Sequence, residues 1–144
     1  MKAEDMLCEY LKIKRDIKRL EVKKEEYKII AESCTVDPTQ EKVQTSKNPD
    51  PMGSAVVEMV SINEKIEEKQ KLAKAYLELL DQCLSEIEKE KEWQLLILRY
   101  FKGATWSEIA DTIGVNNRYV YVLHKNALND LQEIIDEKNL KNIS

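Results

Sequence analysis

The feature that most constrains this chain is a heptad repeat of apolar residues that runs without a break through residues 51–90. One heptad position holds Val56, Asn63, Gln70, Leu77 and Leu84, and the other holds Met59, Ile66, Ala73, Leu80 and Ile87. Spacings that alternate between three and four residues place both series on one face of an α-helix. The repeat predicts a helix from Pro51 to Glu90 with Asp50 as its N-cap. Asn63 and Gln70 are polar exceptions, which fit either a buried register-setting position or a partly open seam.

A second helix is predicted over residues 3–33. Its apolar seam consists of Tyr10, Ile13, Ile17, Leu20, Lys24, Tyr27 and Ala31, and its other faces carry dense Lys and Glu. Between the two helices, residues 35–53 are rich in Pro, Asp, Asn, Ser and Thr, which is typical of a loop. We expect residues 1–92 to form a charged helical hairpin or coiled coil. The sequence leaves open whether one hairpin, two hairpins or two long helices of separate chains bury the seams.

The composition agrees with an all-α fold. The 144 residues include only three Gly and three Pro, and runs that alternate with the period of a β-strand are absent from the sequence. Cys8, Cys34 and Cys83 are odd in number and far apart, so we expect reduced packing residues rather than disulfides or a zinc site. The start of the chain has no apolar run of signal-peptide length, and the longest aliphatic run, residues 95–98, is too short for a membrane span. These features predict a cytoplasmic protein with no membrane partner.

Short helices are predicted from Trp93 onward. The first runs from Trp93 to Phe101 and ends at Lys102-Gly103, where glycine suits the left-handed residue of a C-cap. The second opens on the capping-box sequence TWSE at residues 105–108, in which a Thr hydroxyl accepts from the backbone and a Glu reaches back. It ends at Gly114, and a third helix begins with Asn116 as its N-cap.

The spacing of small and apolar residues over residues 105–131 predicts a helix-turn-helix. Ala110 is small where the two helices cross, Gly114 makes the turn, and Val115 and Val120 fill the angle between the helices. On the third helix, Val120, Leu123, Ala127 and Leu131 are predicted to point inward. We therefore expect a three-helix DNA-binding domain over residues 93–137, followed by a tail over 138–144. A plain three-helix bundle with a solvated polar face is the alternative interpretation.

The outward residues of the third helix are candidates for reading DNA. Arg near the start of a recognition helix pairs with guanine, and Asn pairs with adenine, so Arg118 and Asn117 are predicted base contacts. Val122 suits a thymine methyl group. The predicted DNA-binding set consists of Thr105, Trp106, Ser107, Asn116, Asn117, Arg118, Tyr121, Val122 and Lys125. Of these, Thr105, Trp106, Ser107, Tyr121 and Lys125 suit phosphate contacts.

The charge distribution qualifies this prediction. The chain has a net charge of −4, and residues 93–144 carry six basic and six acidic side chains. A DNA-binding domain is usually basic. Locally, however, residues 114–129 include Arg118, His124 and Lys125 and no acidic residue. The predicted DNA contact therefore rests on a local patch and not on the charge of the whole domain.

The stretch LLILRYFKGATWSEIADTIGVNNRYVYVLHKNALNDL resembles region 4 of bacterial sigma factors, which reads the −35 promoter element. The whole chain, including the loop segment VQTSKNPDPMG, resembles the sigma-like late-gene regulators of phages of Gram-positive bacteria, the ArpU/RinA type. This resemblance implies a transcription regulator of phage or prophage late genes that binds double-stranded DNA. It implies RNA polymerase as a second partner, and it places the base-facing positions at Asn117, Arg118, Tyr121 and Val122.

Enzymatic activity is not predicted. The sequence has one His, no Gly-rich phosphate loop, no metal-ligand spacing and no nucleophile with a base nearby, so we expect neither a cofactor nor a metal. Two other functions remain open. One is the small subunit of a DNA-packaging terminase, which also combines a helix-turn-helix with oligomerising helices. The other is a helical interaction scaffold without DNA binding. A homodimer through the N-terminal helices is compatible with the regulator, since it presents two recognition helices.

Overall fold

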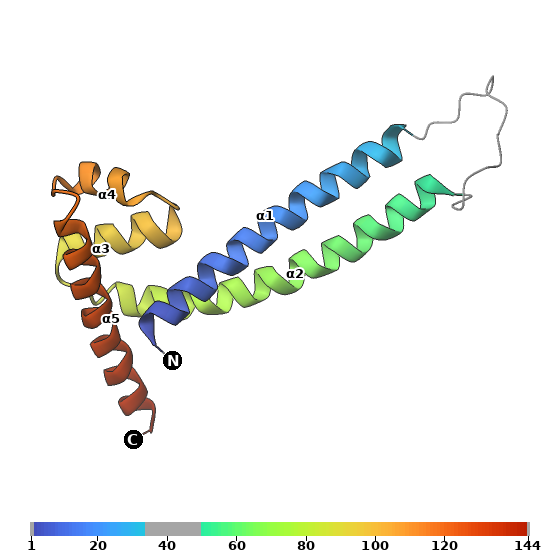
Figure 1. The fold of residues 1–144 in the computed structure, drawn as a ribbon. Helices are drawn as coiled ribbons and strands as arrows, with labels where there is room; N and C mark the ends of the chain where they lie inside the picture. The colour runs from blue at the N-terminus through green and yellow to red at the C-terminus, as the bar shows by residue number, and fades with distance from the viewer. Residues whose placement is uncertain (1, 34–49, 144) are drawn as a thin grey trace. The chain divides into compact units, whose positions relative to one another are not determined.

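The computed structural model describes residues 2–33 and 50–143, and every regular element in these ranges is helical (Figure 1). The all-α prediction is therefore confirmed. The elements in chain order are α1 (Ala3–Ser33), α2 (Pro51–Leu84), α3 (Glu90–Leu96), η1 (Ile97–Phe101), α4 (Trp106–Ile113) and α5 (Tyr119–Ile143). Most of the predicted loop over residues 35–53 lies outside the described residues, as does Cys34, and Pro51, Met52 and Gly53 form the first turn of α2.

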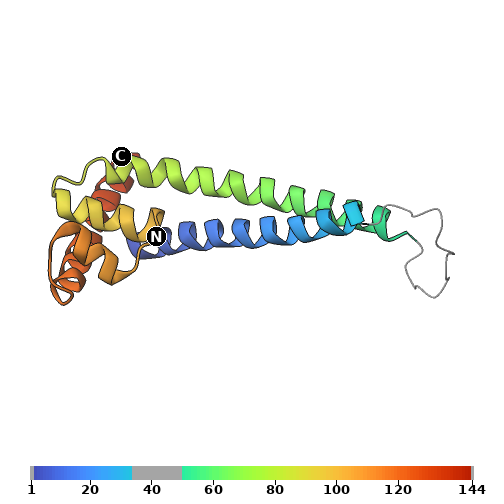
Figure 2. The same cartoon turned by 90° about the horizontal axis from the view of Figure 1, so that it is seen from above.

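The chain divides into two compact units. One consists of residues 13–72, and the other combines residues 1–12 with residues 73–144. In the first unit, α1 and α2 run antiparallel as a two-helix hairpin (Figure 2). An ion pair joins Lys69 Nζ to Asp16 Oδ2 across this hairpin at 3.5 Å. The division predicted from the sequence, at residues 92 and 137, stays a prediction.

The hairpin seam follows the predicted face of α1. Ile13 and Ile17 are buried, and Leu20, Lys24, Tyr27 and Ala31 are half-buried. The start of α2 is also as predicted, because Asp50 Oδ1 accepts a hydrogen bond from the Gly53 N–H at 2.9 Å. Such a cap satisfies one of the free N–H groups at a helix start.

The predicted face of α2 is half right. Ile66, Ala73 and Leu80 of the second heptad series are buried and Met59 is half-buried. The first series is wrong by one residue over most of its length, because Val56 and Leu77 are 45% and 39% exposed. Besides the second series, the residues that α2 turns inward or partly inward include Ala55, Ile62, Lys69, Tyr76 and Cys83, each one residue before a first-series position. Leu84, the last residue of the first series, is buried as predicted. Asn63 is half-buried beside this seam and Gln70 is exposed, so neither amide is a buried position of it.

Helix α2 ends at Leu84 and not at Glu90. The Glu86 N–H donates to the Cys83 carbonyl and the Ile87 N–H donates to the Leu84 carbonyl, at 3.2 and 3.1 Å. Bonds of this i to i+3 type tighten and close a helix end. Lys89 then adopts an extended backbone, with φ −80° and ψ 113°, before α3 begins at Glu90. The heptad repeat did not reveal this end because Ile87 continues the apolar pattern into the turn.

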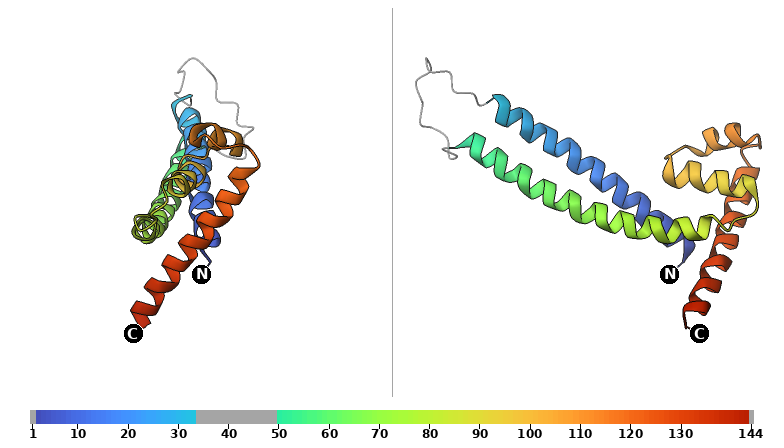
Figure 3. Two further views of the ribbon diagram at one scale, coloured as in Figure 1. Left: turned by 90° about the vertical axis from the view of Figure 1, so that its left-hand side faces the viewer. Right: turned by 180° about the vertical axis from the view of Figure 1, so that it is seen from behind.

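The second unit holds the C-terminal helices. Helix α3 packs on α5 and α4, and α4 is joined to α5 by a short turn (Figure 3). The side chains of Leu95, Leu96, Ile109, Val120 and Leu131 form its core and are fully buried. The first turns of α1 belong to the same unit, where the Tyr10 and Phe101 rings lie 5.0 Å apart. The Ala3 N–H donates to Gln132 Oε1 at 2.6 Å. A side chain of α5 thus accepts a hydrogen bond from the first backbone N–H group of α1.

The helix predicted from Trp93 to Phe101 ends at Phe101 as predicted but differs in its start and in the form of its last turn. It begins at Glu90, and its last turn, η1, is π-helical because the Lys102 N–H donates to the Ile97 carbonyl at 3.1 Å. Helix α5 continues to Ile143, so residues 138–143 are helical. Cys83 is buried as expected for a packing residue, but Cys8 is exposed on α1, so that expectation is wrong for Cys8.

Candidate nucleic-acid interface

The two helices of the predicted helix-turn-helix are α4 and the first part of α5. Helix α4 is capped by Thr105, whose Oγ1 accepts from the Glu108 N–H at 3.2 Å. Before it, Gly103 adopts the left-handed conformation predicted for a C-cap, with φ 70°. The start and the approach of α4 therefore follow from local sequence signals.

The turn between α4 and α5 has the predicted geometry. Gly114 is left-handed, with φ 83°, and the N–H groups of Gly114 and Val115 both donate to the Ala110 carbonyl, at 2.9 and 3.0 Å. Ala110 and Val120 are buried, and Val115 is half-buried. A small residue at the helix crossing and a left-handed glycine thus fix the angle between α4 and α5.

The start of α5 is organised by Asn116. Its Oδ1 accepts from the Arg118 N–H at 3.0 Å and from the Tyr119 N–H at 2.7 Å, which is the predicted N-cap. The Val120 N–H donates to the Asn116 carbonyl, so Asn117 and Arg118 lie in the first turn. Because its oxygen is used in this cap, Asn116 acts on the interface by holding the backbone of Arg118.

The inward face of α5 is as predicted, since Val120, Leu123, Ala127 and Leu131 are all buried. The other side of the helix start is exposed, with Asn117, Arg118, Tyr121, Val122 and Lys125 open to solvent. Tyr121 and Val122 are 55% and 51% exposed. In residues 2–33 and 50–143, no ion pair engages Arg118 or Lys125. Thr105 and Ser107 are also exposed at the start of α4.

Trp106 differs from the other predicted contacts because it is half-buried and surrounded. The Arg99 guanidinium lies 4.4 Å from the centre of the Trp106 ring, a cation–π geometry. The His124 ring lies 4.7 Å away edge-on, and the Tyr121 ring lies 5.4 Å away. Trp106 therefore links η1 to α5 and holds Tyr121 in place on the exposed face.

His124 completes this cluster and was not predicted to have a structural role. Its Nε2 lies 2.8 Å from the Tyr100 hydroxyl. Burial lowers the pKa of His124 below its usual value, and burial raises the pKa of Tyr100 to about 12. Arg99 also donates to the Ala104 carbonyl at 3.1 Å. In the sequence, the cluster is marked only by the presence of Arg99, Tyr100, Trp106 and His124 within one short domain. Their presence alone does not predict which of these side chains are in contact.

Residues 89–133 match the family model described as Sigma-70, region 4. The chain contains a sigma-70 region 4-like segment. The match covers α3, η1, α4 and the first half of α5, and so includes every predicted DNA-binding residue. No curated protein and no solved structure matches the chain significantly. The matched segment contains the helix-turn-helix formed by α4 and the start of α5, and its similarity to sigma-70 region 4 suggests DNA binding.

Two further observations concern alternative kinds of site. Within the described residues, His, Cys, Asp and Glu side chains do not gather in groups of three or more that suit a metal ion. No helix in those residues is both long and apolar enough to cross a membrane.

Proposed function

We propose that this protein is a sequence-specific, cytoplasmic transcription regulator that inserts the start of α5 into a major groove of DNA. The observation that carries the proposal is the exposed, acid-free face of α5 within the region 4-like segment. A recognition helix needs such a face, while its other face packs on the preceding helices.

Individual residues are assigned by their chemistry and position. Arg118 pairs with the N7 and O6 atoms of a guanine, Asn117 pairs with an adenine, and Val122 packs on a thymine methyl group. Thr105, Ser107 and Lys125 contact phosphates. Trp106 and Tyr121 contribute from the ring cluster, in which Trp106 fixes the orientation of Tyr121. Asn116 contributes through the cap that orients Arg118.

The resemblance of the whole chain to the ArpU/RinA type supports a more specific role, the activation of phage or prophage late genes. In this role the protein uses a second source of affinity, because a domain with no net charge releases few counterions on binding DNA. Either a homodimer through the N-terminal helices or contact with RNA polymerase supplies it. A dimer gains about 10²- to 10⁴-fold in apparent affinity through its second contact.

The test begins with selection of a binding site from random DNA by the full-length protein, with and without RNA polymerase. Arg118→Ala is then compared with Arg19→Ala, which removes the same group from an exposed position of α1. We expect Arg118→Ala to cost about 1–3 kcal/mol on the selected site and to relax preference at one base pair. Arg19→Ala leaves both unchanged.

Two outcomes contradict the proposal. Equal loss of affinity on all sequences makes Arg118 a phosphate contact, and failure to bind any DNA at low salt, where phosphate contacts are strongest, favours a scaffold. The mass in solution adds a separate criterion. A monomer or dimer fits a regulator, whereas a ring of many subunits favours a DNA-packaging subunit.

A further inference from the structure

A groove lies beside the N-terminus of α3, apart from the predicted DNA contacts. It has a volume of about 240 Å³ and is lined by Glu86, Ile87, Glu88, Lys89, Asp130, Glu133 and Ile134. Four of these seven side chains are acidic and one is basic. Asp130 lies eleven residues after Tyr119, the first residue of α5, which is about 16 Å along the helix axis. The groove is thus an acidic surface at a distance from the residues proposed to read bases.

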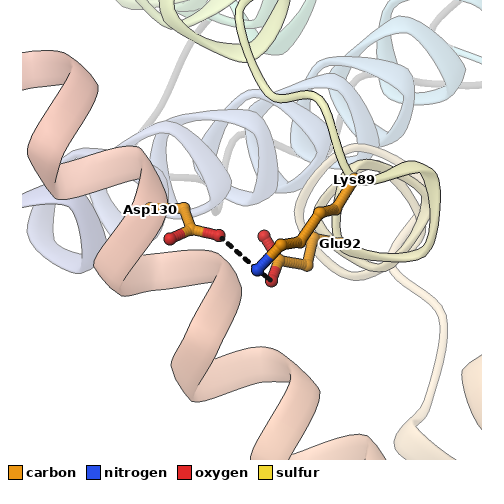
Figure 4. Close-up of polar contacts among 3 residues, drawn as sticks. All are labelled: Lys89, Glu92 and Asp130. Carbon is orange, nitrogen blue, oxygen red and sulfur yellow. Dashed lines mark ion pairs between the residues drawn. The ribbon is translucent and has the colours of Figure 1, made fainter.

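Glu92 does not itself line the groove but lies beside two residues that do, Lys89 and Asp130, and it is 2% exposed (Figure 4). Its Oε1 is 3.7 Å from Lys89 Nζ, and the same nitrogen is 3.7 Å from Asp130 Oδ2. In the part of the chain that the structure describes, Glu92 Oε2 has no hydrogen-bond partner. Figure 4 shows all three side chains pointing toward one another. One loosely held ammonium group therefore stands between two carboxylates.

This arrangement leaves negative charge uncompensated. Both distances exceed those of charge-assisted hydrogen bonds, which are about 2.7–2.9 Å. The Lys89 side chain is 70% exposed, so it reaches the two carboxylates from the solvent side. Burial, reinforced by Asp130, raises the pKa of Glu92 to about 7, which is the expected response of a buried carboxylate without a full counter-charge.

We propose that this groove is a docking site for an arginine side chain of a basic partner protein, which displaces Lys89 and pairs with Asp130 and Glu92. A guanidinium group is planar and carries five donors, so it can bridge two carboxylates that one ammonium group satisfies poorly. Glu88 and Glu133 around the groove attract further basic residues, whereas Glu86 is already paired with Lys138 at 3.0 Å. Ile87 and Ile134 offer an apolar wall for the stem of the arginine. This inference does not depend on DNA binding.

The test measures binding of a fluorescent hexa-arginine peptide to the full-length protein at pH 8 and physiological salt. We expect Asp130→Asn and Glu92→Gln to weaken binding by at least about tenfold, since each removes a charged hydrogen-bond acceptor. Glu68→Gln, on an exposed face of α2, removes the same charge outside the groove and changes binding by less than about twofold. Equal effects of the three variants would show attraction to net charge alone and overturn the proposal.

The decisive pair is Lys89→Met against Lys91→Met. Both remove one exposed lysine near the start of α3, but only Lys89 reaches the carboxylates. We expect Lys89→Met to tighten peptide binding and Lys91→Met to leave it nearly unchanged. The two lysine variants change the net charge equally, so tighter binding by Lys89→Met alone is not an effect of net charge, and circular dichroism of both variants checks that they are folded. If the two lysine variants bind the peptide with the same affinity, the peptide does not displace Lys89 and the proposal is refuted.

The pH dependence of binding provides an independent readout. Arginine competes with the proton on Glu92, so affinity for the peptide should rise between pH 6 and pH 8 in the wild type. The rise should be absent in Glu92→Gln. The same rise in both proteins would mean that Glu92 does not contact the peptide.

Discussion

The Tyr100 hydroxyl lies 2.8 Å from His124 Nε2, and this hydrogen bond ties the π-helical turn η1 to α5 beneath the proposed DNA-reading residues. His124 also touches the Trp106 ring, which receives the Arg99 guanidinium on its face. The orientation of α5 therefore depends on a polar and aromatic cluster as well as on the apolar core. Such a cluster is sensitive to protonation, whereas an apolar core is not.

The first prediction concerns His124 at acid pH. Because burial lowers its pKa in the folded state, the unfolded chain binds more protons than the fold when the pH falls below about 6.5. The contribution of His124 to stability is thus present above that pH and is lost below it, where a second cation enters the surroundings of Arg99. We expect the urea midpoint of the wild type to fall more between pH 7 and pH 5 than that of His124→Gln. Parallel pH profiles of the two proteins would contradict this account.

The second prediction concerns Gly114. A Cβ atom at this position meets no neighbour within 4 Å, but the φ of 83° is strained for residues with side chains. Gly114→Ala should therefore lose about 1–2 kcal/mol of stability through backbone strain alone. Gly114→Asn should lose less, because Asn tolerates the left-handed conformation. Chemical denaturation measures both, and an Ala variant as stable as the wild type would show that the turn has relaxed to another conformation.

The third prediction concerns Ala110 at the crossing of α4 and α5. It is 1% exposed, and its carbonyl accepts two hydrogen bonds from the turn. Ala110→Leu adds volume to a packed site and should cost about 1–3 kcal/mol or more. Thr112→Leu, an exposed position on the same helix, should stay within about 0.5 kcal/mol of the wild type. Unchanged melting of Ala110→Leu by circular dichroism would show that the crossing is not tightly packed.

The sequence predicted the helix-turn-helix well because its signals are local. A Thr cap, an Asn cap and two left-handed glycines each act within a few residues, and Thr105, Asn116, Gly103 and Gly114 occupy the expected geometry. The heptad register of α2 depends on which face meets α1, and periodicity gave no means of choosing Ala55 over its neighbour Val56.

The contacts between side chains of different helices could not be predicted from the sequence. The Trp106 cluster combines side chains from η1, α4 and α5, and no periodic pattern marks such a meeting. The burial of Glu92 is a stronger example, because a Glu among Lys and Glu residues in the sequence EKEKEW is expected to be solvated. Only the packing of α3 on α5 places this carboxyl next to Asp130.

The last prediction follows from that burial. Glu92 has a folded pKa of about 7 against an ordinary 4.5, so the fold binds more protons than the unfolded chain between these values. Stability should therefore be highest at the acid end of this window and decline as the pH rises through it. Glu92→Gln cannot lose a proton, so it should not show this decline and should be more stable than the wild type at pH 8. Urea denaturation of both proteins from pH 5 to pH 8 measures the difference, with Glu68→Gln as the control. A Glu92→Gln variant that loses stability equally at all pH values would mean that the carboxylate is held charged by Lys89, and that the proton plays no part.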